Sequence, residues 1–116
     1  LHACMGDGEL DGTGIEIAGR VCLKVTVVKG HMINRPIIET KEGFYFMASR
    51  EDIHDAIHVA VKDTVNFLMR KKNIPFTIVY RLLSATCDIQ ISELVNDTLT
   101  VRVHVPKLDL QIDSLF

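Results

Sequence analysis

The sequence predicts an α+β fold with a mainly antiparallel β-sheet, one long amphipathic helix and one short helix. Two observations carry this prediction. Some segments alternate apolar and polar residues with the period of a strand, and one segment repeats apolar residues with the period of a helix. Predicted strands both precede and follow the helices. Because the chain has 116 residues, we expect a single domain over residues 1–116.

The first predicted strand covers residues 21–28, where branched apolar side chains fall at every second position. This apolar face consists of Val21, Leu23, Val25 and Val27. A half-buried strand is the structure that such alternation favours. Residues 29–36 predict a loop, because Gly30 and Pro36 interrupt regular structure. Residues 44–48 predict a short strand rich in aromatic side chains.

The long helix is predicted over residues 50–72, with Ser49 as its N-cap. Its apolar positions follow helical spacing: Ile53, Ala56, Ile57, Ala60, Val61, Thr64, Val65 and Leu68. Basic residues and Asn73 mark its C-terminal end, and Pro75 prevents continuation. A shorter helix is predicted over residues 76–85.

Two strands are predicted after the helices, over residues 88–92 and 99–105. Asn96 and Asp97 form a turn signal between them. The second strand alternates valines with polar residues and ends at Pro106, which cannot donate a backbone hydrogen bond. The remaining residues mix aspartates and leucines and predict no definite element.

Composition excludes several classes of protein. Hydrophobic residues make up 47% and charged residues 24%, which is typical of a globular domain. The net charge of −2 argues against nucleic-acid binding, and no apolar run approaches the roughly 20 residues of a membrane span. The three cysteines are widely spaced, so we expect a reducing compartment and no cysteine-based zinc site.

The first 19 residues differ from the rest of the chain, because they hold five of its seven glycines together with four carboxylates. Within them His2, Asp7 and Glu9 form the most promising group of functional residues. Imidazole and carboxylate together suit zinc, and carboxylates suit harder ions such as calcium. A carboxylate in such a site can also act as a general base toward water.

Three other motifs match known sites only in part. The glycine-rich loop lacks the spacing of a dinucleotide fingerprint, since Asp11 falls where glycine is required. It also fails as an EF-hand, because Ala18 occupies the position of the bidentate glutamate. His54 and His58 share a helix face as in a zinc hydrolase, but Asp55 replaces the usual glutamate between them.

The motif at the start of the chain, over residues 1–16, resembles that of the acetamidase/formamidase family. It reads Leu-His-Ala-Cys-Met-Gly-Asp-Gly-Glu over residues 1–9, followed by Gly-Thr-Gly-Ile-Glu over residues 12–16. Later segments resemble the same family. They are the Pro-Ile-Ile-Glu-Thr stretch at 36–40, the helix at 52–68, Tyr-Arg-Leu-Leu-Ser at 80–84, Asp-Ile-Gln-Ile-Ser at 88–92 and Val-Pro-Lys at 105–107.

The resemblance implies a cytoplasmic enzyme that hydrolyses short aliphatic amides such as formamide and acetamide, giving a carboxylate and ammonia. It implies a homo-oligomer built on dimers, whose partner molecule is a small amide rather than a nucleic acid or a membrane. Since the family's N-terminal half has no counterpart here and the first residue is Leu1, we expect the chain to be the C-terminal part of a longer amidase.

The resemblance also implies roles for individual residues. His2 and Asp7 are the expected ligands of a divalent metal, with zinc preferred over calcium, and Glu9 is the expected general base, with Asp7 also in the catalytic group. Residues expected to shape the substrate loop or support it are Gly6, Gly8, Gly12 and Glu16. The roles of Glu39, His54, His58 and Asp88 stay open.

Two other functions are compatible with the same residues. One is a binding or assembly domain without catalytic activity, which the incomplete set of metal ligands favours. The other is a structural fragment stabilised by a metal such as calcium on Asp7, Glu9 and Asp11.

Overall fold

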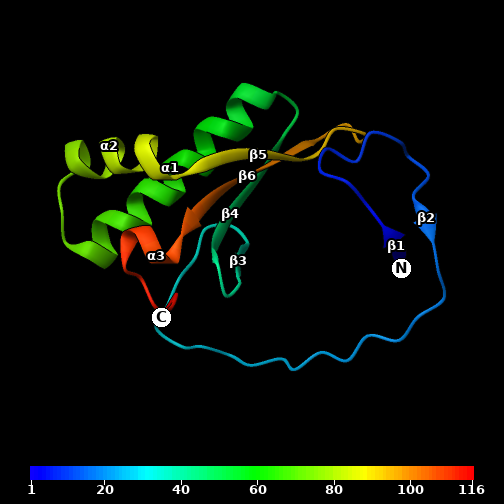
Figure 1. The fold of residues 1–116 in the computed structure, drawn as a ribbon, viewed down its shortest axis with the longest axis horizontal. Coiled ribbons are helices and arrows are strands. Elements are labelled where there is room, and N and C mark those ends of the chain that lie inside the picture. Colours follow the sequence, from blue (N-terminus) through cyan, green and yellow to red (C-terminus); the bar gives the residue numbers. More distant parts are fainter.

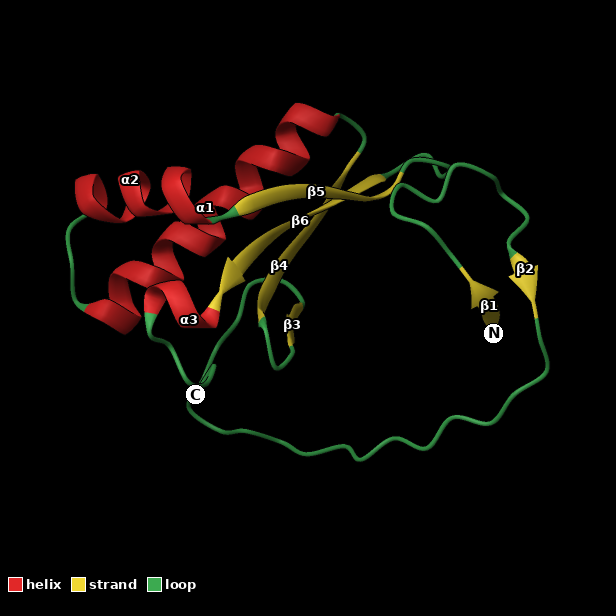
Figure 2. Cartoon of the chain, viewed as in Figure 1, coloured by secondary structure: helices red, strands yellow, loops and turns green.

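The computed structural model describes the whole chain, residues 1–116, apart from the side chain of Asp109. It forms two sheets and three helices (Figures 1 and 2). In chain order, the elements are β1 (His2–Cys4), β2 (Ile15–Glu16), β3 (Ile37–Glu39), β4 (Gly43–Arg50), α1 (Ile53–Lys72), α2 (Phe76–Thr86), β5 (Asp88–Glu93), β6 (Leu99–Pro106) and α3 (Lys107–Leu110). The predicted α+β class is confirmed.

The larger sheet has the strand order β3-β4-β6-β5, and every neighbouring pair is antiparallel. β4 and β6 pair along their whole length, from Gly43 opposite Pro106 to Arg50 opposite Leu99. The strands predicted at residues 44–48, 88–92 and 99–105 are therefore confirmed, each with slightly extended bounds.

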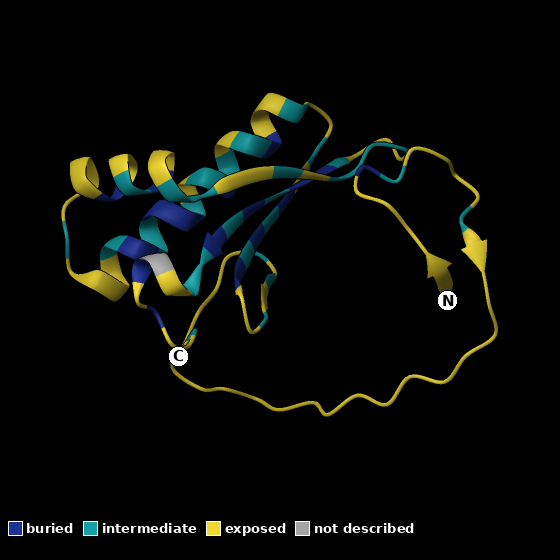
Figure 3. Cartoon of the chain, in the orientation of Figure 1, coloured by how far each residue is buried: buried dark blue, intermediate teal, exposed yellow. Residues whose placement is uncertain are grey.

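The core lies between this sheet and the helices. Alternate residues of the two central strands are buried against α1 and α2, while the residues between them face the other side (Figure 3). The buried set is Phe44, Phe46 and Ala48 on β4, Val101, Val103 and Val105 on β6, Ala56, Ala60, Val65 and Leu68 on α1, and Val79 and Leu83 on α2. The apolar residues at every second position of the strands and those on one face of the helices therefore pack together in a single core.

The predicted start of the long helix is wrong by three residues. Asp52 is the N-cap, since its side chain accepts a hydrogen bond from the Asp55 amide at 3.0 Å. Ser49 instead belongs to β4, where its hydroxyl lies 2.8 Å from that of Thr100 on β6. Asn73 ends α1 in the left-handed conformation, as expected. Among the described residues, no helix combines the length and apolar character needed to cross a membrane.

The strand predicted at residues 21–28 is also wrong for this structure. The segment joins β2 to β3 in an extended path without regular structure, and every one of its residues is exposed (Figure 3). A strand needs a neighbour to receive its backbone hydrogen bonds, and none of the residues described here pairs with this segment. The side chains alternate as in a strand, but no described segment lies beside them to pair with.

Glu39 ties the edge strand β3 to α3 and the C-terminal tail. Lys107 donates to Glu39 Oε1 at 2.6 Å, and the Leu115 amide donates to Oε2 at 3.3 Å. The hydrogen bond from Lys107 is the main reason why the pKa of Glu39 is lowered. The Leu115 amide and the positive charges of Lys107 and Lys71 act in the same direction, and partial burial opposes them.

We predict that this contact contributes to stability above the pKa of an unfolded glutamate, about 4.3, and is lost as the pH falls through the lower pKa of folded Glu39. Urea unfolding at a series of decreasing pH values should show a smaller acid loss of stability for Glu39→Gln than for the parent. Glu42→Gln, an exposed carboxylate in the same turn, is the control. Equal acid losses in parent and Glu39→Gln would contradict the assignment.

Candidate active site on the glycine-rich loop

The predicted functional loop makes a tight turn over residues 6–9. The Glu9 amide donates to the Gly6 carbonyl at 3.3 Å, and Gly8 takes a φ of 94°, which glycine adopts without steric cost. Glu9 itself has a φ of 32°, which is unfavourable for a residue with a side chain. Backbone strain of this kind is concentrated at functional positions, so the turn singles out Glu9.

The small sheet brings His2 beside Glu9. β1 and β2 are antiparallel and place His2 opposite Glu16. His2 Nδ1 lies 3.9 Å from Glu9 Oε1 and 3.3 Å from the sulfur of Met5. A Cβ atom at Gly14 would come within 3.0 Å of the His2 ring, so glycine is needed there for the ring to keep this position. Glu9 therefore has an imidazole as its close neighbour.

Asp7 points the other way, toward the large sheet, where it meets Arg102 of β6. Arg102 Nη2 donates to both carboxylate oxygens, at 2.7 and 2.8 Å. The same guanidinium donates from Nε to Gln90 at 2.8 Å and from Nη1 to Ser92 at 3.1 Å, both on β5. Since all three nitrogens of Arg102 are engaged, its fork fixes Asp7 against two neighbouring strands.

A second contact fastens the loop to the end of the large sheet. The Leu94 amide, directly after β5, donates to the Gly8 carbonyl at 2.8 Å. A Cβ atom at Gly12 would lie 3.5 Å from the Val95 side chain, so the loop approaches this connection closely. Gly8 is buried although its neighbours are not. The loop is therefore held by the sheet on one side while Glu9 faces away from it.

A hollow of about 420 Å³ lies beside Glu9. Its walls come from the turn and from the chain leading into β2, and they include Cys4, Gly6, Glu9, Asp11, Thr13 and Gly14. This volume accommodates a small organic molecule with its water. A strained, half-buried carboxylate that opens onto such a hollow is suited to abstract a proton from water.

The predicted residues do not assemble into a complete metal site. His2 and Glu9 lie together, whereas Asp7 is held by Arg102 and Glu16 is only the backbone neighbour of His2 in the β1–β2 pair. Among the side chains that the structure describes, no group of three His, Cys, Asp or Glu could hold a metal ion. A catalytic zinc takes three protein ligands, so these residues alone do not fit one.

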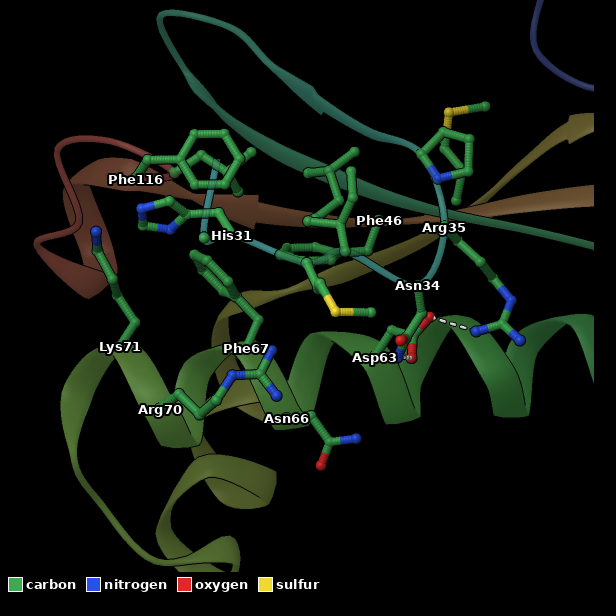
Figure 4. Close-up of a pocket in the computed structure, with 17 residues that line it drawn as sticks. His31, Asn34, Arg35, Phe46, Asp63, Asn66, Phe67, Arg70, Lys71 and Phe116 are labelled. Carbon is green, nitrogen blue, oxygen red and sulfur yellow. Dashed lines mark hydrogen bonds and ion pairs between the residues drawn. The ribbon is translucent and has the colours of Figure 1, made fainter. Parts of the chain in front are cut away.

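A second cavity of about 360 Å³ lies between α1, the loop before β3 and the C-terminal tail (Figure 4). Phe46 and Phe67 contribute apolar surface to it. The only carboxylate among its lining residues, Asp63, receives a hydrogen bond from Asn34 at 3.1 Å and an ion pair from Arg35 at 2.6 Å. Because both oxygens of Asp63 are engaged by Asn34 and Arg35, the hollow beside Glu9 is the better candidate for hydrolysis.

The other histidines lie elsewhere. His54 and His58 are exposed on α1, with no third ligand in the described part of the chain. His104 is half-buried on β6, stacked on Tyr45 at 4.6 Å between ring centroids, and its Nδ1 lies 3.8 Å from Asp88 Oδ2. This contact gives Asp88 a structural partner, on the same polar sheet face as Arg102.

Sequence reasoning missed Arg102. The available signal was a charged residue in the middle of an alternating apolar strand, which places a cation at the centre of one sheet face. The pairing with Asp7 could not be read from the sequence, because 95 positions separate the two residues.

We predict that Arg102→Lys loosens the loop, because an ammonium cannot donate to Asp7, Gln90 and Ser92 at once. Asp7 is 65% exposed, so solvent screening keeps the effect moderate. Amide hydrogen exchange at residues 6–9 should become roughly fivefold faster, which corresponds to about 1 kcal/mol. Arg81→Lys, on the exposed face of α2, should leave this exchange unchanged. Unaltered exchange in Arg102→Lys would show that the loop is held by other contacts.

No family model and no curated protein matches the sequence. Solved structures do match it. A recombinant predicted acetamidase/formamidase from the thermophile Thermoanaerobacter tengcongensis is 36% identical, with a TM-score of 0.87 over 95% of this chain and 36% of its own. Acetamidase from Bacillus halodurans is 35% identical, with a TM-score of 0.88 over 95% of this chain and 37% of its own. Acetamidase from Yersinia enterocolitica is 29% identical, with a TM-score of 0.88 over 94% of this chain and 33% of its own.

The matches include almost the whole of this chain, so they cover the glycine-rich loop as well as the large sheet and its helices. The chain spans about a third of the length of these structures. The family resemblance of the motifs is confirmed by structure and by sequence identity together. This protein is related to the acetamidases and formamidases and has the fold of about one third of such a chain.

Proposed function

We propose that this chain carries the proton-transferring loop of an amidase that hydrolyses short aliphatic amides, such as formamide and acetamide, to a carboxylate and ammonia. The single observation that supports this most is the strained, half-buried Glu9, which opens onto the 420 Å³ hollow on a loop fixed to the sheet. The relationship to acetamidase structures supports the choice of amides.

Glu9 is the general base in this proposal. It takes a proton from a water molecule, whose oxygen forms a bond to the carbonyl carbon of the amide. The resulting tetrahedral intermediate carries a negative oxygen. Collapse of the intermediate breaks the C–N bond, and the proton held by Glu9 passes to the departing nitrogen, so that the carboxylic acid and ammonia leave. Glu9 is then ready for another cycle.

The surrounding residues keep Glu9 in position and receive charge. The imidazole of His2, with Nδ1 3.9 Å from Glu9 Oε1, is the basic side chain beside the Glu9 carboxylate. Backbone amides of Gly6, Gly8 and Gly12 are the proposed donors to the negative oxygen, since a glycine lets a ligand approach its N–H group closely. Arg102 is a positioning residue, because it acts on the loop through Asp7 and not on the amide.

The proposal includes a divalent metal ion, zinc rather than calcium, only if ligands from outside the described residues complete its site. His2 and Glu9 can supply two, while both oxygens of Asp7 face Arg102. When bound, such an ion would polarise a carbonyl or acidify a water molecule. No step above depends on it. A homo-oligomer built on dimers is likewise part of the proposal.

We predict that Glu9→Gln lowers kcat for formamide and acetamide by at least roughly 100-fold, because the amide cannot accept the proton of water. Ammonia release by the longest natural polypeptide containing this sequence is the measurement. Glu51→Gln, an exposed carboxylate before α1, is the matched control and should keep full activity. Far-UV circular dichroism checks that each variant is folded.

Unchanged turnover in Glu9→Gln would remove Glu9 from the reaction. A folded parent protein that releases no ammonia from either amide would overturn amide hydrolysis as a whole. A binding or assembly domain would then be the better account of the loop.

A separate prediction concerns metal. If zinc is bound with His2 as a ligand, His2→Ala should lose most of the zinc that survives dialysis. His54→Ala should retain it, because His54 is exposed on α1 and belongs to no group of three possible ligands among the described residues. Elemental analysis of the dialysed proteins gives the zinc content. Loss of zinc in His54→Ala alone would place the metal on the helix and contradict the proposal.

A further inference from the structure

The segment between β2 and β3 has the side-chain pattern of a strand without the structure of one. Figure 1 shows it as a long extended arc that runs apart from the sheets. Its apolar face is exposed by 59% at Val21, 79% at Leu23, 87% at Val25 and 80% at Val27. No backbone hydrogen bond among the described residues involves positions 21–28.

Both properties are unfavourable in water for an isolated chain. An extended backbone with open N–H and C=O groups is a template for strand pairing, and proteins normally protect such edges with charge, proline or a covering element. Contiguous exposed apolar side chains mark interaction surfaces. This segment has regular alternation and no proline, so it is suited to accept a neighbouring strand.

The matching structures indicate which polypeptide could lie beside residues 21–28. The matches cover 95% of this chain, so at most about six residues lie outside them and the eight-residue segment cannot be wholly among those. Those proteins are more than twice as long as this chain, which covers 36% and 37% of them. At least part of this segment therefore has a counterpart in proteins that contain much additional polypeptide.

The charge of the segment indicates which kind of strand can pair with it. Residues 20–29 contain Arg20, Lys24 and Lys29 and no acidic residue. A second copy of this chain would place an equally basic strand alongside, and like charges on paired strands are destabilising. A strand with acidic residues at its polar positions is complementary.

We propose that residues 21–28 form a β-strand that pairs with a strand of the polypeptide corresponding to the two thirds of the relatives that this chain does not match. That partner strand is apolar at alternate positions and acidic between them. Pairing would bury the valine face and give the backbone groups their hydrogen bonds. This inference is independent of the amidase chemistry.

Amide hydrogen exchange tests the proposal. In the isolated 116-residue chain, residues 21–28 should exchange as fast as an unstructured peptide. In the longest natural polypeptide that contains the sequence, alternate amides of this segment should exchange at least roughly tenfold more slowly, because one edge of a strand presents every second N–H group.

Val25→Pro removes one donor and should abolish this protection, whereas Met32→Pro, also highly exposed but outside the segment, should not. Fast exchange at residues 21–28 in the natural polypeptide would overturn the proposal. Protection that depends on protein concentration and accompanies dimer formation by the 116-residue chain would also overturn it, in favour of a second copy.

Discussion

The alternation of side chains along β4 and β6 is the constraint on which the rest of the structure depends. Because successive residues of a strand point to opposite faces, the same two strands bury Phe44, Phe46 and three valines against the helices and turn Tyr45, Arg102 and His104 to the other side. The core therefore fixes the register of the sheet. The register in turn determines the position of Arg102 on the polar face of the sheet.

Arg102 links this core to the candidate site. The glycine-rich loop has little apolar surface of its own to bury, so its position depends on polar contacts. The guanidinium joins Asp7 to Gln90 and Ser92, and the Leu94 amide holds the Gly8 carbonyl. These contacts leave Glu9 free to face the hollow. Asp7 in this account is the anchor of the loop, while Glu9 carries the chemistry.

The sequence is sufficient to predict those helices and strands whose periodic apolar pattern is clear within the segment itself. The long helix and the strands on either side of it show clear periods, and capping residues and prolines mark their ends. The start of α1 was misplaced because Ser49 and Asp52 are both good caps, and only the pairing of Ser49 with Thr100 decides between them.

Features that depend on distant partners could not be predicted in the same way. The segment at residues 21–28 has a strand pattern, but strand formation requires a neighbour. At the site, the sequence grouped His2, Asp7 and Glu9 together. The structure keeps His2 beside Glu9 but pairs Asp7 with Arg102, and that pairing follows from the sheet register. The sequence indicates which residue types could be functional, but it does not show which residues far apart in the chain are paired.

In the proposed reaction, the anchored loop presents Glu9 to the bound amide. A crystal structure of the longest natural polypeptide with acetamide bound tests this most directly. We expect the amide in the hollow beside Glu9, with a water molecule about 2.6–3.2 Å from the Glu9 carboxylate and directed at the carbonyl carbon. Acetamide bound instead in the cavity between α1 and the C-terminal tail, with Glu9 facing no ligand, would contradict the account.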